Sequence, residues 1–118
     1  MTVDVYRSDF VYMVPPFFAV STQNASVLNM AIQQIIDYRA ILKTDSGVWS
    51  HISASGDPDA DLWSTGNGWA AMGITRVWAT ACYTSAQNSQ TDTLKGWVKE
   101  IIDDAMLAPV SRMNRNFF

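Results

Sequence analysis

Two segments of the chain contain residues whose types and spacing could do chemistry. In the first, "SDFVYMVPPFFA", Asp9 immediately precedes the most apolar stretch of the sequence. Desolvation by such neighbours would raise the pKa of the Asp9 carboxyl group and equip it as a general acid. The alternative, equally open from composition, is that Asp9 only caps the turn that follows it.

The second segment, "LWSTGNGWAAMG", places Gly66 and Gly68 around Asn67, between Trp63 and Trp69. The two glycines could supply positive φ angles at a junction between loop and helix, while the tryptophans fill the core. A phosphate-binding loop is set aside because the preceding strand and the glycine spacing of a dinucleotide fingerprint are missing. The sharper interpretation is a sugar site, in which indole faces stack on a pyranose ring and the glycines let the backbone approach.

Other site classes are disfavoured by residue counts. His51 is the one histidine in the sequence, which disfavours a zinc or iron site and leaves a nucleophile triad without a recognisable motif. The one cysteine, Cys82, excludes an internal disulfide, and its neighbours predict a small buried residue rather than a nucleophile. We therefore expect no metal and no cofactor.

Composition narrows the range of partners. The 118 residues suit one domain, but only 16% are charged while 48% are hydrophobic and five are tryptophan. Such a chain has apolar surface to cover, either in a homo-oligomer, which we expect, or against further elements of a larger fold. The net charge of −3, without a basic stripe, predicts no nucleic-acid partner.

The sequence also shows no pattern typical of a membrane span or a signal peptide. The longest apolar run, "FVYMVPPFFAV", is about half the length of a membrane span and contains two prolines. No signal peptide pattern opens the chain. We therefore expect no membrane partner, and the compartment stays undetermined.

Apolar periodicity and punctuation predict an all-α chain of two helical hairpins. Pro15 or Pro16 should open the first helix, and Thr91 and Asp92 are candidate caps of the last. No strand pattern is recognised in the long loop before the glycine motif, and residues 109–118 form a C-terminal tail. The expected helices lie at about residues 15–22, 26–43, 68–84 and 92–107.

Three motifs together resemble a known family. "SDFVYMVPPFFA", "SGVWSHI" and "LWSTGNGWAAMGITRVWAT" occur in the order and approximate spacing found in six-hairpin glycosidases similar to unsaturated rhamnogalacturonyl and glucuronyl hydrolases, particularly fungal ones. The resemblance extends from about Arg7 to Met106. It implies that residues 1–118 form a single partial domain, the middle portion of an (α/α)6 barrel. The family's upstream hairpins, which bring a second important aspartate, have no counterpart in this chain.

The resemblance also implies a reaction and a site. Asp9 matches the family's general acid and base, while His51, Trp63, Asn67 and Trp69 match positions in or near the sugar site. In that reaction a proton is delivered to the double bond of a 4,5-unsaturated uronic acid, water adds, and the resulting hemiketal opens to release the neighbouring sugar. The implied partner is therefore an oligosaccharide, and relatives of this kind are often secreted.

One residue of the glycine motif differs from the family pattern, and this difference suggests an alternative function. Bacterial members often have an arginine directly before Gly-Asn-Gly-Trp, whereas this chain has Thr65, which cannot pair with a uronate carboxylate. Together with the missing second aspartate, this leaves open a truncated, non-catalytic protein that binds carbohydrate or another partner. The enzymatic activity is therefore uncertain from the sequence.

Overall fold

The computed structural model describes residues 5–21, 24–54, 61–86, 88–107 and 113–114, and these are mostly helical. This confirms the all-α fold class with two helical hairpins. The helices are α1 (Phe10–Ser21), α2 (Ala25–Leu42), α3 (Ser64–Tyr83) and α4 (Ser89–Leu107). The short strands are β1 (Val5–Arg7), β2 (Ile52–Ala54), β3 (Leu62–Trp63) and β4 (Met113–Asn114).

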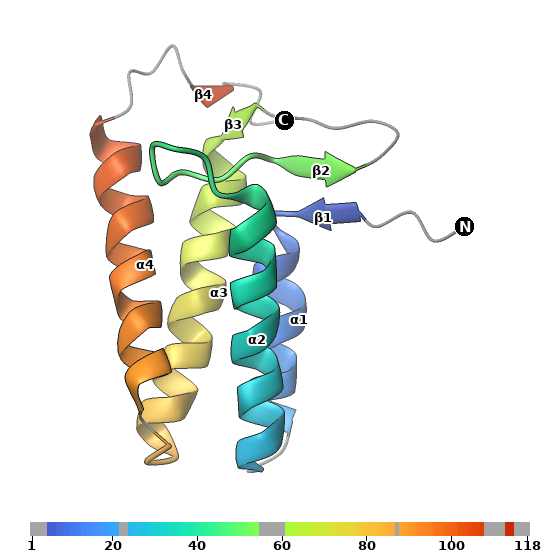
Figure 1. Ribbon diagram of the computed structural model, residues 1–118, viewed down its shortest axis with the longest axis vertical. Helices are drawn as coiled ribbons and strands as arrows, with labels where there is room; N and C mark the ends of the chain where they lie inside the picture. Colours follow the sequence, from blue (N-terminus) through green and yellow to red (C-terminus); the bar gives the residue numbers. More distant parts are fainter. Residues whose placement is uncertain (1–4, 22–23, 55–60, 87, 108–112, 115–118) are drawn as a thin grey trace.

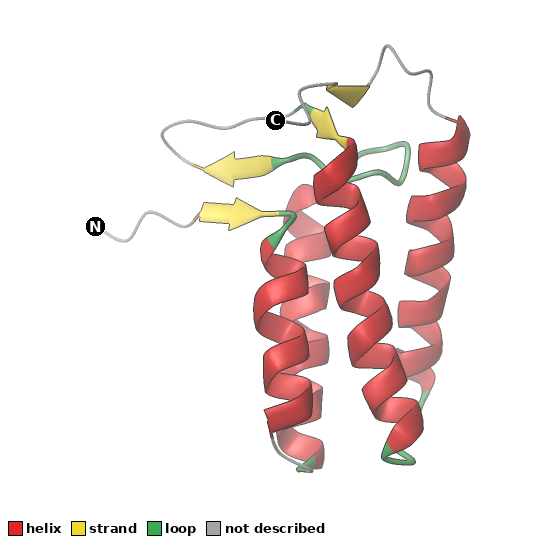
Figure 2. Ribbon diagram, turned by 180° about the vertical axis from the view of Figure 1, so that it is seen from behind, coloured by secondary structure: helices red, strands yellow, loops and turns green. Residues whose placement is uncertain are grey.

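The helices form two layers. Helices α1 and α3 run in the same direction and pack closely together, while their hairpin partners α2 and α4 run the opposite way in the second layer (Figures 1 and 2). Apolar side chains between the layers form the core because each helix turns one apolar stripe inward. The core includes Val11, Ile32, Ile35, Ile74, Val77 and Leu94.

All four strands lie at one end of the helical bundle (Figure 1). Strands β1 and β2 are antiparallel, and β3 and β4 are parallel. The amino ends of α1 and α3 lie at this same end (Figure 1), which we call the strand end. It is therefore the place where segments far apart in the sequence meet.

Helix α1 begins at Phe10, five residues before the predicted start, and contains both prolines. Pro15 has no N–H to donate to the carbonyl of Val11, which would ordinarily weaken a helix interior. Helix α3 approaches at this point, because a Cβ added to Gly73 would lie 2.1 Å from the Val11 carbonyl oxygen. Tertiary packing thus stabilises a helix that the prolines alone argue against.

Helix α3 begins at Ser64, four residues before the predicted start. Gly66 and Gly68 lie inside it, so the prediction that they turn the chain with positive φ angles is wrong. Gly66 instead permits close packing, since a Cβ there would lie 2.3 Å from the Ser8 hydroxyl oxygen. Among the glycines that the structure describes, Gly47 has a positive φ, at 93°.

Helix α2 agrees with its prediction to within one residue, and α4 begins three residues earlier than predicted. Asn88, rather than Thr91 or Asp92, caps α4: its side-chain oxygen accepts hydrogen bonds from the N–H groups of Gln90 and Thr91 at 2.9 and 3.1 Å. Cys82, predicted to be buried, is half-buried.

The predicted long loop and tail contain short strands. Strands β2 and β3 interrupt the loop, and residues 113–114 of the predicted tail pair with β3. The other tail residues from 109 onward lie outside the part that the structure describes. Strands of two or three residues are too short to show an alternating pattern, so the sequence does not predict them.

Candidate functional site

The segment that carries Asp9 is fixed at the strand end by β1. Arg7 pairs with Ile52 in the antiparallel register of β1 and β2. One residue later, the Ser8 N–H donates a 3.0 Å hydrogen bond to the carbonyl of His51. The backbone thus brings the Asp9 segment beside the His51 segment, which lies about 40 residues away in the sequence.

The Asp9 carboxylate is buried, with 8% of the residue exposed, and it is paired with Arg7. Arg7 donates from Nε to Oδ1 at 3.2 Å and from Nη2 to Oδ2 at 3.3 Å, a side-on bidentate pair. The backbone carbonyl of Asp9 accepts from the Tyr12 N–H, but its carboxylate makes no capping hydrogen bond within the described residues. The Asp9 side chain therefore pairs with Arg7 and does not cap the following turn.

Tyr38 of α2 packs against β1, the strand that leads to Asp9. Its ring packs edge to face against Tyr6, with the ring centroids 5.3 Å apart. Burial raises the pKa of the Tyr38 phenol, and the nearby Tyr6 and the charge of Asp9 raise it further. The Tyr38 phenol therefore keeps its proton to a higher pH than an ordinary tyrosine does.

His51 and Trp63 form an aromatic pair beside this carboxylate segment. Their ring centroids lie 4.4 Å apart with an interplanar angle of 50°. The backbone N–H groups of both residues donate to the Asp61 carbonyl, at 3.0 and 3.1 Å. Both side chains are half-buried, so each ring is held in place and still reaches solvent.

Asn67, unlike these two half-buried residues, has almost no exposed surface. Its Oδ1 accepts from the Trp49 N–H at 2.7 Å, and its Nδ2 donates to the carbonyls of Trp49 and Trp63 at 2.9 and 3.1 Å. The residue is buried and its carboxamide is occupied by backbone groups. Asn67 therefore positions the site and is not placed to contact a sugar directly.

Trp69 lies on an exposed part of α3 that faces α1. It is 40% exposed and its ring lies against Tyr12 of α1, with centroids 4.5 Å apart. Tyr12 follows Asp9 by three residues, so this aromatic pair lies about one helical turn below the strand end. The structure thus gathers Asp9, His51 and Trp63 at the strand end, with Trp69 one turn away.

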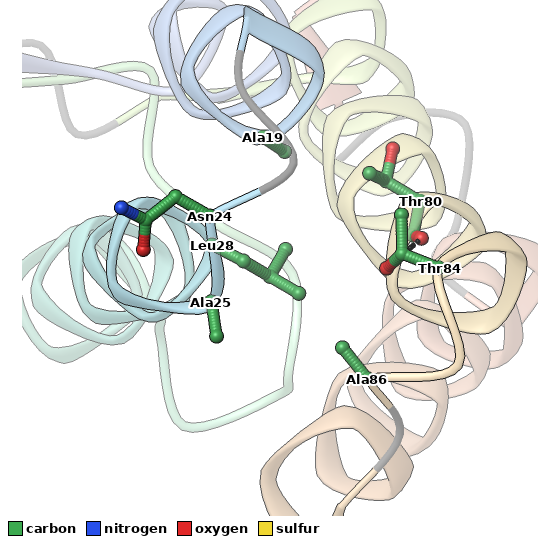
Figure 3. Close-up of a pocket in the computed structure, with 7 residues that line it drawn as sticks. All are labelled: Ala19, Asn24, Ala25, Leu28, Thr80, Thr84 and Ala86. Atoms are coloured by element: carbon green, nitrogen blue, oxygen red, sulfur yellow. Dashed lines mark hydrogen bonds between the residues drawn. The ribbon is translucent and has the colours of Figure 1, made fainter.

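A small cavity lies at the opposite end of the bundle (Figure 3). It has a volume of about 110 Å³ and is lined mostly by apolar and small side chains, with Leu28 of α2 facing Thr80 of α3 and Thr84 directly after that helix (Figure 3). It contains none of the predicted site residues. We therefore do not assign it to the candidate site.

The described residues contain neither a metal-binding cluster nor a membrane-spanning helix. No three side chains of His, Cys, Asp or Glu lie close enough together there to hold a metal ion. None of the helices described is both long enough and apolar enough to cross a membrane.

Comparisons with protein families, curated proteins and solved structures give no match for the chain. The resemblance to six-hairpin glycosidases thus rests on the sequence motifs themselves.

Sequence reasoning missed four residues that shape the site: Arg7, Ser8, Tyr38 and Trp49. Arg7 could have been found, because residues two apart in an extended segment lie on the same side, which places Arg7 beside Asp9. Tyr38 and Trp49 carry no comparable local signal, since the packing of Tyr38 against Tyr6 and the hydrogen bond of Trp49 to Asn67 join separate elements.

Proposed function

We propose that this chain is a glycoside hydrolase-like protein that acts on unsaturated uronyl or related oligosaccharides. The observation that carries the proposal is that the buried Asp9 carboxylate and the half-buried ring pair of His51 and Trp63 stand on neighbouring segments, which the hydrogen bond from the Ser8 N–H to the His51 carbonyl joins. A desolvated carboxyl group can transfer a proton, and aromatic rings supply a face for a sugar.

In the proposed reaction, Asp9 in its protonated form delivers a proton to carbon 4 of the unsaturated uronate. A water molecule adds at carbon 5 and gives a hemiketal, and its opening releases the neighbouring sugar. Asp9 recovers a proton from the attacking water, which returns the site to its starting state. Arg7 must release one carboxylate oxygen before that oxygen can carry the proton, so Arg7 is a positioning residue in this scheme.

The helix arrangement supports the proposed kinship with (α/α)6 barrels. In such a barrel, successive hairpins place one helix in an inner layer and its partner in an outer layer. Helices α1 and α3 correspond to two inner neighbours, and α2 and α4 to their outer partners (Figure 2). The candidate residues then lie at the amino ends of the inner helices.

A second candidate function is a carbohydrate-binding or interaction protein without catalysis. It is favoured by the bidentate pairing of Arg7 with Asp9, which occupies both carboxylate oxygens. It is also favoured by Thr65, which stands at the position of the bacterial arginine. The aromatic residues would keep their sugar-facing role in this alternative.

We also propose that the chain forms a homo-oligomer. Its support is a set of apolar side chains on α4 that project into solvent, including Ile102, Met106 and Leu107. A groove of about 350 Å³ lies beside Ile102, between α3 and α4, with Trp78 and Val98 in its wall. A second copy could cover this surface.

The test of the enzymatic proposal compares wild type with Asp9→Asn on an unsaturated uronyl disaccharide. Loss of the double bond is followed as a fall in ultraviolet absorbance. We expect the asparagine variant to fold and to bind the disaccharide but to lose about 10²- to 10⁴-fold in turnover, because an amide cannot deliver the proton. Equal rates would reject the catalytic role of Asp9, and binding without turnover in wild type would favour the second candidate.

A further inference from the structure

Arg76 is an exposed cation that lacks an acidic partner in the described part of the chain. Its guanidinium carbon lies 4.7 Å from the centre of the Tyr12 ring. No described residue forms a hydrogen bond or ion pair with its side chain. Arg7 and Arg39, in contrast, are paired with carboxylates.

Arg76 lines a groove between α1 and α3 of about 530 Å³. The wall is apolar and aromatic, with Tyr12, Pro16 and Phe17 contributed by α1. Among the described residues that line this groove none is acidic, and Arg76 carries the one formal charge.

The groove adjoins the candidate site through Tyr12. The Tyr12 ring contacts Trp69 and also carries the Arg76 guanidinium, so the three side chains form a row along the α1–α3 face. Tyr12 is three residues after Asp9, which corresponds to about 4.5 Å along the helix axis. A ligand in the groove could therefore extend toward the strand end.

We propose that this groove is a binding subsite for a carboxylate-bearing saccharide, with Arg76 receiving the carboxylate and the Tyr12–Trp69 pair contacting the sugar ring. The ligand class rests on the proposed function. A guanidinium that lies over a ring keeps its N–H donors available at its edge, where a carboxylate can bind in bidentate fashion. Arg76 would thus supply, from another position, the charge that Thr65 does not.

The test is calorimetric titration of the full chain with digalacturonate and with its neutral methyl ester. We expect wild type to bind digalacturonate at least about tenfold more tightly than the ester, and binding to weaken as salt rises. Arg76→Gln should lose about tenfold or more in affinity for digalacturonate. Arg76→Lys should keep part of it, because the charge remains without the planar fork.

Lys95→Gln is the matched control, because Lys95 is an exposed cation beside an aromatic ring, Trp78, in the separate groove between α3 and α4. Since that groove is also the proposed contact between copies, wild type and both variants are titrated at a concentration where light scattering gives them the same mass. The affinity of Lys95→Gln should stay within about twofold of wild type. The proposal is overturned if wild type does not bind digalacturonate, if the ester binds equally well, or if Arg76→Gln and Lys95→Gln behave alike. Turnover of the unsaturated disaccharide is measured separately, so a failure of catalysis remains distinguishable from a failure of this subsite.

Discussion

At the scale of single residues, the Asn67 carboxamide joins two segments that meet at the strand end. It accepts from and donates to the backbone of Trp49, and it also donates to the Trp63 carbonyl. The loop that precedes His51 is thereby attached to the first turn of α3. The asparagine of the Gly-Asn-Gly-Trp motif thus acts on the site through the backbone that it orients.

Asn67→Ala should lower the free energy of unfolding by about 2 to 4 kcal/mol, because it removes three hydrogen bonds and leaves buried backbone groups of Trp49 unsatisfied. Chemical denaturation measures the loss. Asn29→Ala, at an exposed position on α2, is the control and should change stability by no more than about 0.5 kcal/mol. Similar losses in both variants would contradict the structural role of Asn67.

At the scale of elements, the close crossing of α1 and α3 depends on Gly73. A Cβ at this position would lie 2.1 Å from the Val11 carbonyl oxygen and 2.8 Å from the Tyr12 Cα, both of them backbone atoms. Gly73→Ala should therefore force the helices apart and destabilise the fold by about 2 kcal/mol or more, despite the better helix propensity of alanine.

The control for this crossing is Gly96→Ala in the middle of α4, where an added Cβ meets no atom within 4 Å. This change should stabilise the protein by up to about 1 kcal/mol, since alanine is the better helix former. Thermal unfolding of both variants gives the comparison. A Gly73→Ala protein as stable as Gly96→Ala would show that the helices do not cross so closely.

Helices α2 and α4 are connected by Glu100, which pairs with Arg39 at 2.7 Å and Lys43 at 3.4 Å. Partial burial acts to raise the pKa of Glu100, but the hydrogen bond and charge of Arg39, aided by Lys43, outweigh it and lower the pKa. A carboxyl group whose pKa is lowered on folding stabilises the fold above its unfolded pKa. That contribution is lost as the pH falls through the folded pKa.

Unfolding measured between pH 7 and pH 3 should therefore show that the free energy of unfolding decreases as the pH is lowered. Glu100→Gln should remove part of this dependence. Asp103→Asn is the control, because Asp103 pairs with Lys99 on the exposed face of α4, where ion pairs contribute little. Glu100 is not the source of the dependence if Glu100→Gln keeps the full slope of wild type.

The sequence predicts the limits of an element well where the local spacing of apolar residues is regular. The uninterrupted apolar spacing of α2 set its limits to within one residue. The start of α1 was hidden by Pro15 and Pro16, whose place inside a helix depends on packing against α3. The motifs likewise pointed to Asp9 and Trp69, but the packing of Tyr38 against Tyr6 arises between elements and has no signature in a single sequence.

At the scale of the whole molecule, the exposed apolar side chains of α4 predict self-association. Light scattering at tens of micromolar should return a mass greater than that of one chain. Ile102→Glu should shift the mass toward the monomer, because a charge would be buried in the contact. Met30→Glu, on the exposed face of α2, should leave the mass unchanged. A wild-type protein that stays monomeric would remove the proposal.

Asp9 is proposed to deliver a proton to a carbon atom of the substrate. The most direct measurement is the reaction of wild type with an unsaturated uronyl disaccharide in heavy water, followed by proton nuclear magnetic resonance. We expect one solvent-derived deuterium at carbon 4 of the uronate product, and no such product with Asp9→Asn. Release of the neighbouring sugar with the double bond intact and no deuterium at carbon 4 would contradict this role of Asp9.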